Sequence, residues 1–536
     1  MPIGRRRILP VLVVIGIAAL SRIGLAGRQG LWADEIFSLA MATGHSLEHP
    51  AAEAVPELGD FVEPPEAQPA TAFRRYLSHQ PGTFLMPRVI RAVLLSDTSP
   101  PLYYVTLAWW TELFGTSDRA LHLFSTLWAL ACFPWLWYLG RRTGGRRAGL
   151  TACILFAAAP VGLYYSLEGR MYSLLWFLAV LTGALSVKLH DRGSKPGLLL
   201  LWILVGAAGF LTHYFFAFVW AACAVWLWFS PGRSARRWLL GAILLTALLV
   251  LPWYLHVPES LARWRITGHW LDGRLTLRQT LTAPAYLGWS LLSGRGVWGG
   301  IKRVDRLGEL VLLILGLLAF FRARRWLFSG PRQLLWLWVL AACTGPVVFD
   351  LLRGTFTALI TRYALAGVPA AMLLLGVILS RLPTAVQVVG GTLFLSSWIP
   401  GLAIISRSTS RGWEPYREVA AAVGAQTAPG DLLLVHSIPS GVIGIARYYD
   451  GAAPIAAWVG QLGRRRVPDD VENLVQGRRR VALIRIHEVG DAATQEAWLR
   501  QHATLLSEQQ LQNAHMAYFA PRDAATFEAG TADTSR

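Results

Sequence analysis

Charged residues are scarce in this sequence. They make up 15% of the 536 residues, whereas hydrophobic residues make up 54%, and long apolar runs recur from Ile8 to Ile405. This composition excludes an ordinary soluble protein and is typical of an α-helical polytopic membrane protein.

Cysteine is also rare, and the positions of the cysteines indicate no disulfide and no metal site. All four cysteines are isolated within apolar segments: Cys132, Cys153, Cys223 and Cys343. This spacing excludes a disulfide framework and a cysteine metal site. The first apolar run lacks a small-residue cleavage site after it, so we expect a retained helix and not a signal peptide.

The formal net charge of +18 comes from arginine clusters that lie between apolar runs. The positive-inside rule places such clusters in cytoplasmic loops, so no nucleic-acid partner is needed to explain them. The clusters are Arg5 to Arg7, Arg141 to Arg147, Arg233 to Arg237 and Arg322 to Arg325. They predict a multi-pass protein with a cytoplasmic N-terminus.

The apolar runs predict about 11 transmembrane helices when each span takes about 20 residues. The expected spans are 8–26, 119–140, 148–165, 171–190, 198–213, 214–229, 238–256, 307–321, 333–351, 363–380 and 384–405. The first two arginine clusters share a side only if an even number of spans separates them. Three candidates lie between them: 8–26, Pro100 to Gly115, and 119–140. Pro100 to Gly115 is short and rich in Tyr and Trp, so we interpret it as an interfacial or re-entrant helix and not as a span.

Two parts follow from this pattern. Residues 1–405 form the transmembrane part, in which 27–118 is a first external loop with interfacial helices. Residues 406–536 alternate helical and strand patterns, which predicts a small extracytoplasmic α/β domain. Helices are expected at 416–426 and 494–503, strands at 432–437 and within 478–486, and a disordered tail over the last dozen residues.

The acidic pair Asp34 and Glu35 lies just beyond the first span, where an unpaired charge is costly. A carboxylate there can serve as a general base or as a metal ligand. An alternative is that the pair caps the helix that begins with "EIFSLAMA", since Asp is a favoured N-cap. Because neighbouring helical residues diverge by about 100°, we expect the two carboxylates to have different roles.

Other polar residues are expected on the same external face, and each has an ordinary explanation as well as a functional one. Tyr103 and Tyr104 suit interfacial anchoring, Glu168 and Arg170 suit a mutual ion pair, and Arg362 suits snorkelling. Arg170 is equally suited to grip a phosphate. His213 is expected at the outer bend between two short helices. The basic segment 257–306 could attract anionic lipid head groups or phosphates.

In their order along the chain, several motifs resemble bacterial members of glycosyltransferase family 39, within the GT-C superfamily that includes protein O-mannosyltransferases and the aminoarabinose transferase of lipid A. The resemblance covers the membrane region to about residue 405, and the tail is similar to the periplasmic domain that follows in many such proteins. The motifs are "WADEIFSLA", "SPPLYYVTLAWWTELFG", "RALHLFSTLWAL", "GRRTGGRRAGL", "YYSLEGRMYSLL", "LTHYFF" and "TRYALAGVP".

The resemblance implies an inverting transfer of a sugar from a polyprenyl-phosphate donor to an acceptor at the external or periplasmic side of the bacterial plasma membrane. Asp34 matches the residue that deprotonates the acceptor hydroxyl. Departing lipid phosphate needs stabilising charge, which Arg170 and Arg362 would supply.

The remaining candidate residues have supporting roles. Glu35, Tyr103, Tyr104 and Glu168 would shape the acceptor site, and His213 and Tyr363 would join the two arginines around the donor phosphate. Glu35 and Glu168 are also candidate ligands of a divalent cation, Mg or Mn, although a monophosphate leaving group makes a metal less necessary. Ser99 stands where the family often has His before the Pro pair, so the resemblance assigns that position no acid-base or phosphate role.

Two other functions stay open. A transporter or flippase of lipid-linked sugars would use the polar residues for passage, but the sequence shows no convincing internal repeat of the kind common in transporters. A structural or biogenesis factor leaves the convergence of Asp34, Glu168 and Arg362 unexplained. The acceptor is a protein hydroxyl, lipid A, a cell-wall glycan or another lipid, and membrane lipids are the other expected partners.

Overall fold

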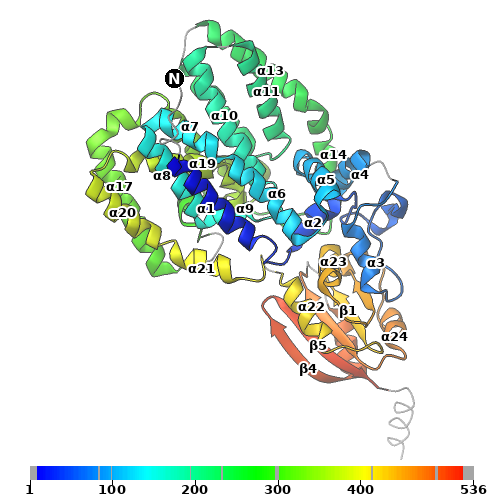
Figure 1. The fold of residues 1–536 in the computed structure, drawn as a ribbon. Helices are drawn as coiled ribbons and strands as arrows, with labels where there is room; N and C mark the ends of the chain where they lie inside the picture. The colour runs from blue at the N-terminus through cyan, green and yellow to red at the C-terminus, as the bar shows by residue number, and fades with distance from the viewer. Residues whose placement is uncertain are drawn as a thin grey trace, which may run out of the picture.

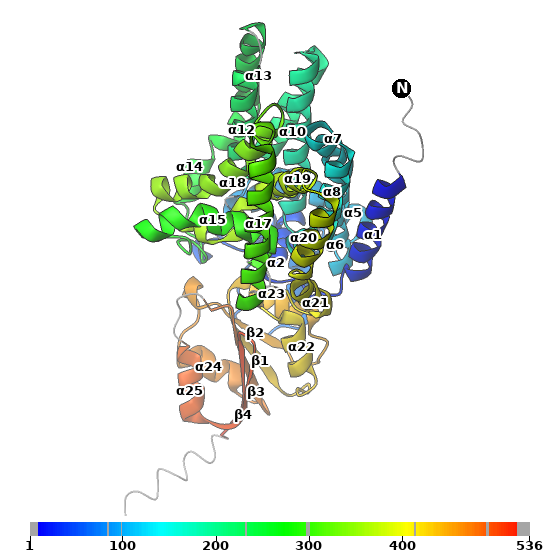
Figure 2. The ribbon, with the colours of Figure 1, turned by 90° about the vertical axis from the view of Figure 1, so that its left-hand side faces the viewer.

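The computed structural model describes residues 9–82, 85–97, 99–193, 195–230, 233–295, 301–411, 414–488 and 493–522. A helical part is followed by a smaller C-terminal unit built on one sheet, which covers one end of the helices (Figures 1 and 2). The expected arginine cluster Arg5 to Arg7 and the expected disordered tail from Thr526 onward lie outside the described residues.

The main helices of the helical part follow the apolar runs. They are α1 (Leu9–Leu25), α6 (Asp118–Ala131), α7 (Phe133–Gly144), α8 (Arg146–Ala158), α9 (Pro160–Ser166), α10 (Tyr172–Arg192), α11 (Pro196–Phe210), α12 (Phe216–Phe229), α13 (Arg233–Tyr254), α17 (Lys302–Leu327), α18 (Arg332–Arg353), η6 (Thr361–Gly367), α19 (Val368–Leu379), α20 (Thr384–Ser396) and α21 (Ile399–Arg407). Each of the expected spans coincides with one or two of these helices.

Shorter helices lie in the two long segments between spans. The first segment holds α2 (Ala33–Ala42), η2 (Ala51–Glu53), η3 (Pro56–Leu58), α3 (Ala70–Arg74), η4 (Arg75–Leu77), α4 (Leu85–Ser96) and α5 (Leu102–Phe114). The second segment holds α14 (Val257–Ala262) and α15 (Leu277–Ser293), and η5 (Thr357–Leu359) lies between α18 and η6. The aromatic segment Pro100 to Gly115 is helical, as expected, and Trp109 and Phe114 are exposed on it.

By length and composition, 6 helices among the described residues can cross a membrane, or 7 if the bent pair α8 and α9 is one span. Three shorter apolar helices, α1, α11 and α12, accompany them. The expected count of about 11 stays a prediction. The expected division of 198–229 into two short helices is confirmed, since α11 and α12 leave His213 in the turn between them.

Close packing in the helical part depends on small residues, as in other membrane helix pairs. A Cβ added to Gly140 of α7 would lie 2.4 Å from the Gly149 Cα of α8, so these helices touch through their backbones. Similarly, a Cβ on Gly209 would meet the Phe216 ring at 2.2 Å, which lets α12 fold back against α11. The core is centred on α10, which is buried on nearly all sides.

The C-terminal unit holds a five-stranded sheet in the order β2-β1-β3-β5-β4. β1, β2 and β3 are parallel, and β5 runs antiparallel to both β3 and β4. The strands are β1 (Leu432–His436), β2 (Ile455–Trp458), β3 (Val481–Ile486), β4 (Ala503–Leu511) and β5 (Ala514–Pro521). The helices are α22 (Tyr416–Gly424), α23 (Pro439–Tyr448), η7 (Gly460–Leu462), α24 (Asp469–Val475) and α25 (Thr494–His502).

The sequence therefore predicted this unit's class and four of its elements, α22, β1, β3 and α25. The strands β2, β4 and β5 were missed, as were the helices α23 and α24. β2 has only four residues, and β4 carries a mostly exposed polar sequence at the edge of the sheet. Neither has the alternating pattern of a half-buried strand.

Asp118 joins the C-terminal unit to the helical part. Its Oδ1 accepts hydrogen bonds from Arg447 Nε at 2.9 Å and Nη2 at 2.7 Å, while its Oδ2 accepts from Arg417 and from the Tyr448 hydroxyl at 2.7 Å. The Tyr448 oxygen in turn accepts from the Leu31 N–H at 2.7 Å, three residues before Asp34. The C-terminal unit thus holds the chain segment that leads into α2.

We expect Asp118→Ala to destabilise the docking of the C-terminal unit. Removing one partner of a buried ion pair costs about 3 to 5 kcal/mol because the other charges stay buried, and here two guanidinium groups lose their carboxylate. The variant should show a lower thermal midpoint and faster proteolytic release of the C-terminal unit. Asp450→Ala is the matched control, since Asp450 pairs with Arg74 but its side chain is 92% exposed. Equal stability of the two variants would contradict the role given to Asp118.

Candidate active site

The acidic pair lies in the first turn of α2, whose N-cap residue is Trp32. The alternative in which Asp34 is the N-cap is therefore wrong, because Asp34 already lies inside the helix. Glu35 does contribute to the cap, since its Oε2 accepts a hydrogen bond from the Trp32 N–H at 3.3 Å. As expected from their positions on the helix, the two carboxylates face different surroundings.

The Asp34 carboxylate lies beside two guanidinium groups. Its Oδ2 accepts a hydrogen bond from Arg362 Nη1 at 2.9 Å and lies 3.9 Å from Arg170 Nε. The Asp34 side chain is 27% exposed, and its Oδ1 accepts no hydrogen bond from any residue that the structure describes. One oxygen of the carboxylate is thus oriented by arginine while the other can receive a proton.

The Glu35 carboxylate is fully buried, on the other side of α2. Its Oε1 accepts from the Gly169 N–H at 2.6 Å and lies 3.3 Å from His122 Nε2. Burial favours the protonated acid, but His122, Arg411 and the Gly169 amide outweigh this and lower the pKa of Glu35 below its ordinary value. Glu35 therefore links α2 to α6 and to the turn that carries Arg170.

Arg170 is the centre of the site. Its Nη1 donates to the Tyr104 hydroxyl at 3.2 Å and to Ser38 Oγ at 3.1 Å, and its Nη2 lies 3.6 Å from Asp97 Oδ2. The expected ion pair between Arg170 and Glu168 does not form. Asp34 and Asp97, which come from separate segments, take its place.

Asp97 is a residue that the sequence reasoning missed. Tyr104 donates to its Oδ2 at 2.8 Å, and Ser99 donates to its Oδ1 through both N–H and hydroxyl at 3.1 Å. Burial opposes ionisation, but Arg170, Tyr104 and Ser99 together lower the pKa of Asp97. Its position two residues before the "SPP" motif was the available signal, and Ser99 has the defined task of orienting it.

Glu168 lies close to these groups but is bound differently. Its side chain is buried, and its Oε2 has no hydrogen-bond partner among the described residues. Burial raises the pKa of Glu168 to about 8, against the opposing charge of Arg411. Arg411, also missed from the sequence, donates to the Tyr164 carbonyl at 3.0 Å and lies over the Tyr164 ring.

The other predicted residues surround this centre. The Tyr103 ring is buried against Tyr104 and Phe124, in the core between α5 and α6. His213 Nδ1 accepts from the Phe215 N–H at 3.1 Å, and the Tyr363 ring lies 5.1 Å from the Phe215 ring. These three side chains thus support the walls of the site.

The basic segment after α14 reaches the same place. The Arg362 guanidinium lies over the Trp270 ring at 4.9 Å, so Trp270 covers the cation that holds Asp34. The backbone near Trp270 is tied down by Glu48, whose Oε2 accepts from the Thr267 N–H at 3.0 Å. The other oxygen of Glu48 has no hydrogen-bond partner among the described residues.

Glu48 gives a prediction about pH. Burial raises the pKa of Glu48 from 4.5 to about 7. The folded protein therefore binds this proton more tightly than the unfolded chain does. As the pH rises from about 4.5 to about 7, the free energy of unfolding falls progressively, by up to about 3 kcal/mol. We expect Glu48→Gln to raise the thermal midpoint relative to wild type at pH 8 and to leave it nearly unchanged at pH 4.5. Exposed Glu57→Gln is the control, and a pH-independent effect of Glu48→Gln would contradict this prediction.

One group among the described residues has the spacing of a metal site: Glu496, Glu508 and His515, in the C-terminal unit. Arginines already engage the carboxylates there, since Arg500 pairs with both Glu496 and Glu508. Glu35 binds the N–H of Gly169, the residue after Glu168, but Glu35 and Glu168 are not part of a three-ligand group among the described residues. Their expected role as ligands of Mg or Mn stays a prediction.

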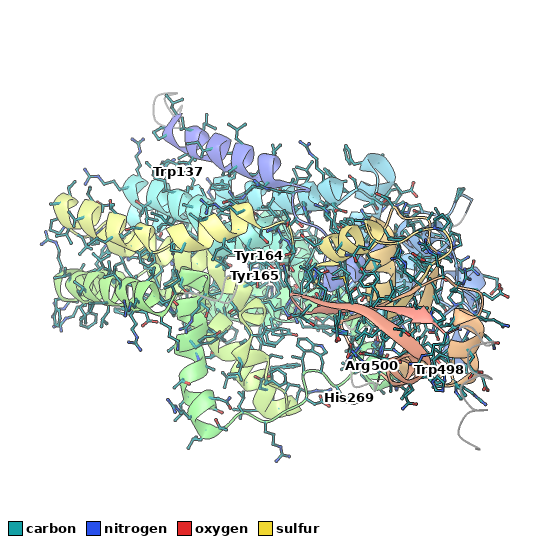
Figure 3. The ribbon with its side chains drawn as sticks, turned by 90° about the horizontal axis from the view of Figure 1, so that it is seen from below. Trp137, Tyr164, Tyr165, His269, Trp498 and Arg500 are labelled. Carbon is teal, nitrogen blue, oxygen red and sulfur yellow. The ribbon has the colours of Figure 1, made fainter. Side chains whose placement is uncertain are left out.

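Figure 3 shows the molecule from below, on the side of the C-terminal unit, with Tyr164 and Tyr165 of α9 near the centre of the view. The β4–β5 hairpin is tied to this region, because Gln512 Nε2 donates to Ser410 Oγ at 3.3 Å and the next residue, Arg411, binds Tyr164. The site is therefore enclosed by the helical part on one side and by the C-terminal unit on the other.

Comparison with known proteins shows which families and folds this chain is similar to. Residues 98–256 match the profile of the dolichyl-phosphate-mannose-protein mannosyltransferase family. No curated protein matches the sequence significantly. The structure is similar to that of ArnT from Cupriavidus metallidurans in the apo state, with a TM-score of 0.53, 11% identity, and coverage of 89% of this chain and 95% of that one.

A second structure of the same protein, bound to undecaprenyl phosphate, gives a TM-score of 0.53 and 13% identity over 96% of this chain and 98% of that one. The Archaeoglobus fulgidus oligosaccharyltransferase in complex with Zn and sulfate gives a TM-score of 0.42 and 13% identity, over 88% of this chain and 67% of that one. The family match and the ArnT fold confirm the resemblance to the GT-C superfamily expected from the motifs.

Proposed function

We infer that this chain, which has the fold of the membrane GT-C glycosyltransferases, transfers a sugar from a polyprenyl-phosphate donor to an acceptor hydroxyl, with inversion at the anomeric carbon. The observation that carries this proposal is the Asp34 carboxylate, whose Oδ2 binds Arg362 and lies 3.9 Å from Arg170 Nε, while its Oδ1 accepts no hydrogen bond from any described residue. Such an arrangement places a proton acceptor next to two cations suited to a phosphate.

The charged groups have defined tasks in this reaction. Asp34 Oδ1 takes the proton of the acceptor hydroxyl, whose oxygen forms a bond to the anomeric carbon. The bond between that carbon and the phosphate oxygen breaks, and its electron pair leaves with the lipid phosphate. A guanidinium carries five N–H donors, so Arg362 can hold Asp34 and still stabilise the departing phosphate. A glycosidase needs a second carboxyl as acid, but a phosphate leaving group does not.

Asp97 and Tyr104 fix the position of Arg170 in this proposal. Together with Ser38 they hold the guanidinium from three directions, so it can face the phosphate without rearrangement. Preorganised charge of this kind is the largest contribution to many enzymatic rate enhancements. Glu35 and Glu168 would shape the acceptor side, or bind a divalent ion brought in with the substrate.

We place the reaction at the extracytoplasmic face of the bacterial plasma membrane, with a cytoplasmic N-terminus. The support is the charge pattern: arginine-rich loops flank the spans, and the candidate site lies at the end of the helices that the C-terminal unit covers. The sugar, a hexose or a pentose, is set by side chains that contact the donor ring.

The test is turnover of a panel of polyprenyl-phosphate sugars, labelled in the sugar, by the protein purified in detergent. We expect release of free polyprenyl phosphate with transfer of label to an acceptor fraction or to water. In proteoliposomes, passage of intact labelled donor across the bilayer without cleavage would favour a flippase. Absence of cleavage of every donor in the panel would overturn the proposed function.

A further inference from the structure

The C-terminal unit has a crevice at the carboxyl end of β3, between that strand and the β4–β5 hairpin. From β1 the chain passes through α23 to β2 on one side, and then through α24 to β3 on the other side of β1. α23 packs into the core shared with the helical part, and α24 packs into the separate core on the opposite face of the sheet. These two helices therefore lie on opposite faces of the sheet.

A polar cavity of about 390 Å³ lies at the end of β3. Its lining comes from the end of β3, from β4 and β5, and from the hairpin that joins them: Arg485, Ile486, His487, Glu488, Gln510, Asn513 and His515. The Nδ1 atoms of His487 and His515 are buried and have no hydrogen-bond partner among the described residues. Buried polar atoms are normally bonded, so these nitrogens point to a ligand or water.

His487 also has an unusual backbone. Its φ is +52°, in the left-handed region that non-glycine residues rarely adopt, and such strain concentrates at functional sites. The conformation turns the chain at the end of β3 and brings His487 Nδ1 to 3.7 Å from Glu414 Oε1, in the segment that returns from the helices.

The cavity borders the segment that leads from the helices into the C-terminal unit, since His487 lies beside Glu414 and Gln512 of the hairpin donates to Ser410. Burial lowers the pKa of His487, and the negative charge of Asp34 opposes that shift. The same charge acts on Tyr416 of α22, where burial is the main cause of a raised pKa. The hydrogen bond between Gln512 and Ser410 connects the hairpin to Arg411 and Tyr164, as described above. An acceptor extending from Asp34 toward the sheet would enter this cavity.

The lining favours neutral hydroxyl groups over a phosphate. Arg485 is held by both oxygens of Glu488, at 2.6 and 2.8 Å, and by Glu496 at 2.7 Å, so its charge is compensated. Gln510, whose Nε2 donates to the Gln512 carbonyl at 2.9 Å, offers its amide oxygen, Asn513 offers an amide donor and acceptor, and the two histidines offer ring nitrogens. This set matches the alternating donors and acceptors of a sugar.

We propose that the acceptor carries a saccharide and that its sugar residues occupy this crevice of the C-terminal unit while the hydroxyl to be glycosylated lies at Asp34. The proposal rests on the proposed function, and it narrows the acceptor to a glycan or glycolipid. Gln510 and Asn513 then determine acceptor affinity and take no part in donor cleavage.

The experiment uses the full-length protein, a labelled polyprenyl-phosphate sugar that wild type cleaves, and washed membranes of the source organism, with its own gene deleted, as acceptor. The variant is Gln510→Ala combined with Asn513→Ala. The control is Gln509→Ala, because Gln509 neighbours Gln510 on β4 and points to the other face of the sheet. We expect the variant to raise the membrane concentration needed for half-maximal transfer about tenfold, as for two lost hydrogen bonds. Its maximal rate and donor hydrolysis in water should match those of the control.

Two results would contradict the proposal that the acceptor binds in the crevice. One is an unchanged membrane concentration for half-maximal transfer in the variant, and the other is an equal fall in transfer and in donor hydrolysis. Analysis of the labelled product gives a second readout, since label joined directly to an amino acid or to a lipid without sugar would also overturn it. The proposed function fails separately, if wild type cleaves no polyprenyl-phosphate sugar at all. Thermal midpoints of the variant and the control are compared to establish equal folding.

Discussion

Asp34→Asn should lower the maximal rate of sugar transfer about a thousandfold, as expected for loss of a general base, and leave the protein folded. Asparagine keeps the size of the side chain and an oxygen that accepts from Arg362 Nη1, but it cannot take the acceptor proton. The half-maximal donor concentration should change little, because the guanidinium groups that face the phosphate stay in place. The measurement is single-turnover transfer from a labelled polyprenyl-phosphate sugar.

Asp97→Asn is the informative comparison for this variant. Asp97 also binds Arg170, at 3.6 Å, but it lies behind the guanidinium and its oxygens are occupied by Tyr104 and Ser99. Its replacement should therefore weaken donor binding more than it lowers the rate. Full activity in Asp34→Asn would overturn the base assignment, and equal effects of both replacements on the rate would assign Asp34 only a positioning role.

The positions of the helices could be predicted because each apolar run is long enough to form one by itself. The pair α11 and α12 shows how far this goes: a run of 32 apolar residues with one histidine indicates two short helices, and His213 lies in the turn between them. Which of these helices span the membrane is harder to predict. α17 is helical, yet its charged ends exclude it from the helices that qualify as spans by composition.

The sequence predicted that several charged residues lie together at the candidate site, but it did not predict which of them form ion pairs. Charge parity placed Asp34, Arg170 and Arg362 on one face, and the structure brings the three together. The sequence offered Glu168 as one candidate partner of Arg170, since they are two residues apart, whereas Arg170 pairs with Asp34 and Asp97. Such choices depend on how helices pack, and one-dimensional spacing does not contain that information.

The role of His122 also could not be predicted from the sequence. It lies within the apolar helix α6, where a histidine is usually explained as a satisfied core residue. Only the approach of α2 to α6 places its Nε2 3.3 Å from Glu35 Oε1, and only the Gly27 N–H, which donates to its Nδ1 at 3.0 Å, orients the ring. The role of a polar residue inside an apolar helix therefore depends on what the neighbouring helix presents to it.

Arg362→Met should lower the maximal rate about a hundredfold or more, as for removal of one group that stabilises transition-state charge. It should also weaken binding of undecaprenyl phosphate, which resembles the product. The reason is that Arg362 contacts Asp34 at 2.9 Å and is 20% exposed, so it faces both the base and the space beside it. Arg362→Lys keeps the charge but loses the fork of donors, so we expect an intermediate rate.

Arg353→Met is the matched control, because Arg353 is an exposed arginine at the end of α18, shortly before Arg362 in the chain. It should leave both the rate and undecaprenyl phosphate binding unchanged. The decisive contrast is with Asp34→Asn, which should bind undecaprenyl phosphate as tightly as wild type, because the cations remain. If Arg362→Met lowered the rate but left that binding unchanged, Arg362 would act only by orienting Asp34, and the phosphate would have to be held by Arg170.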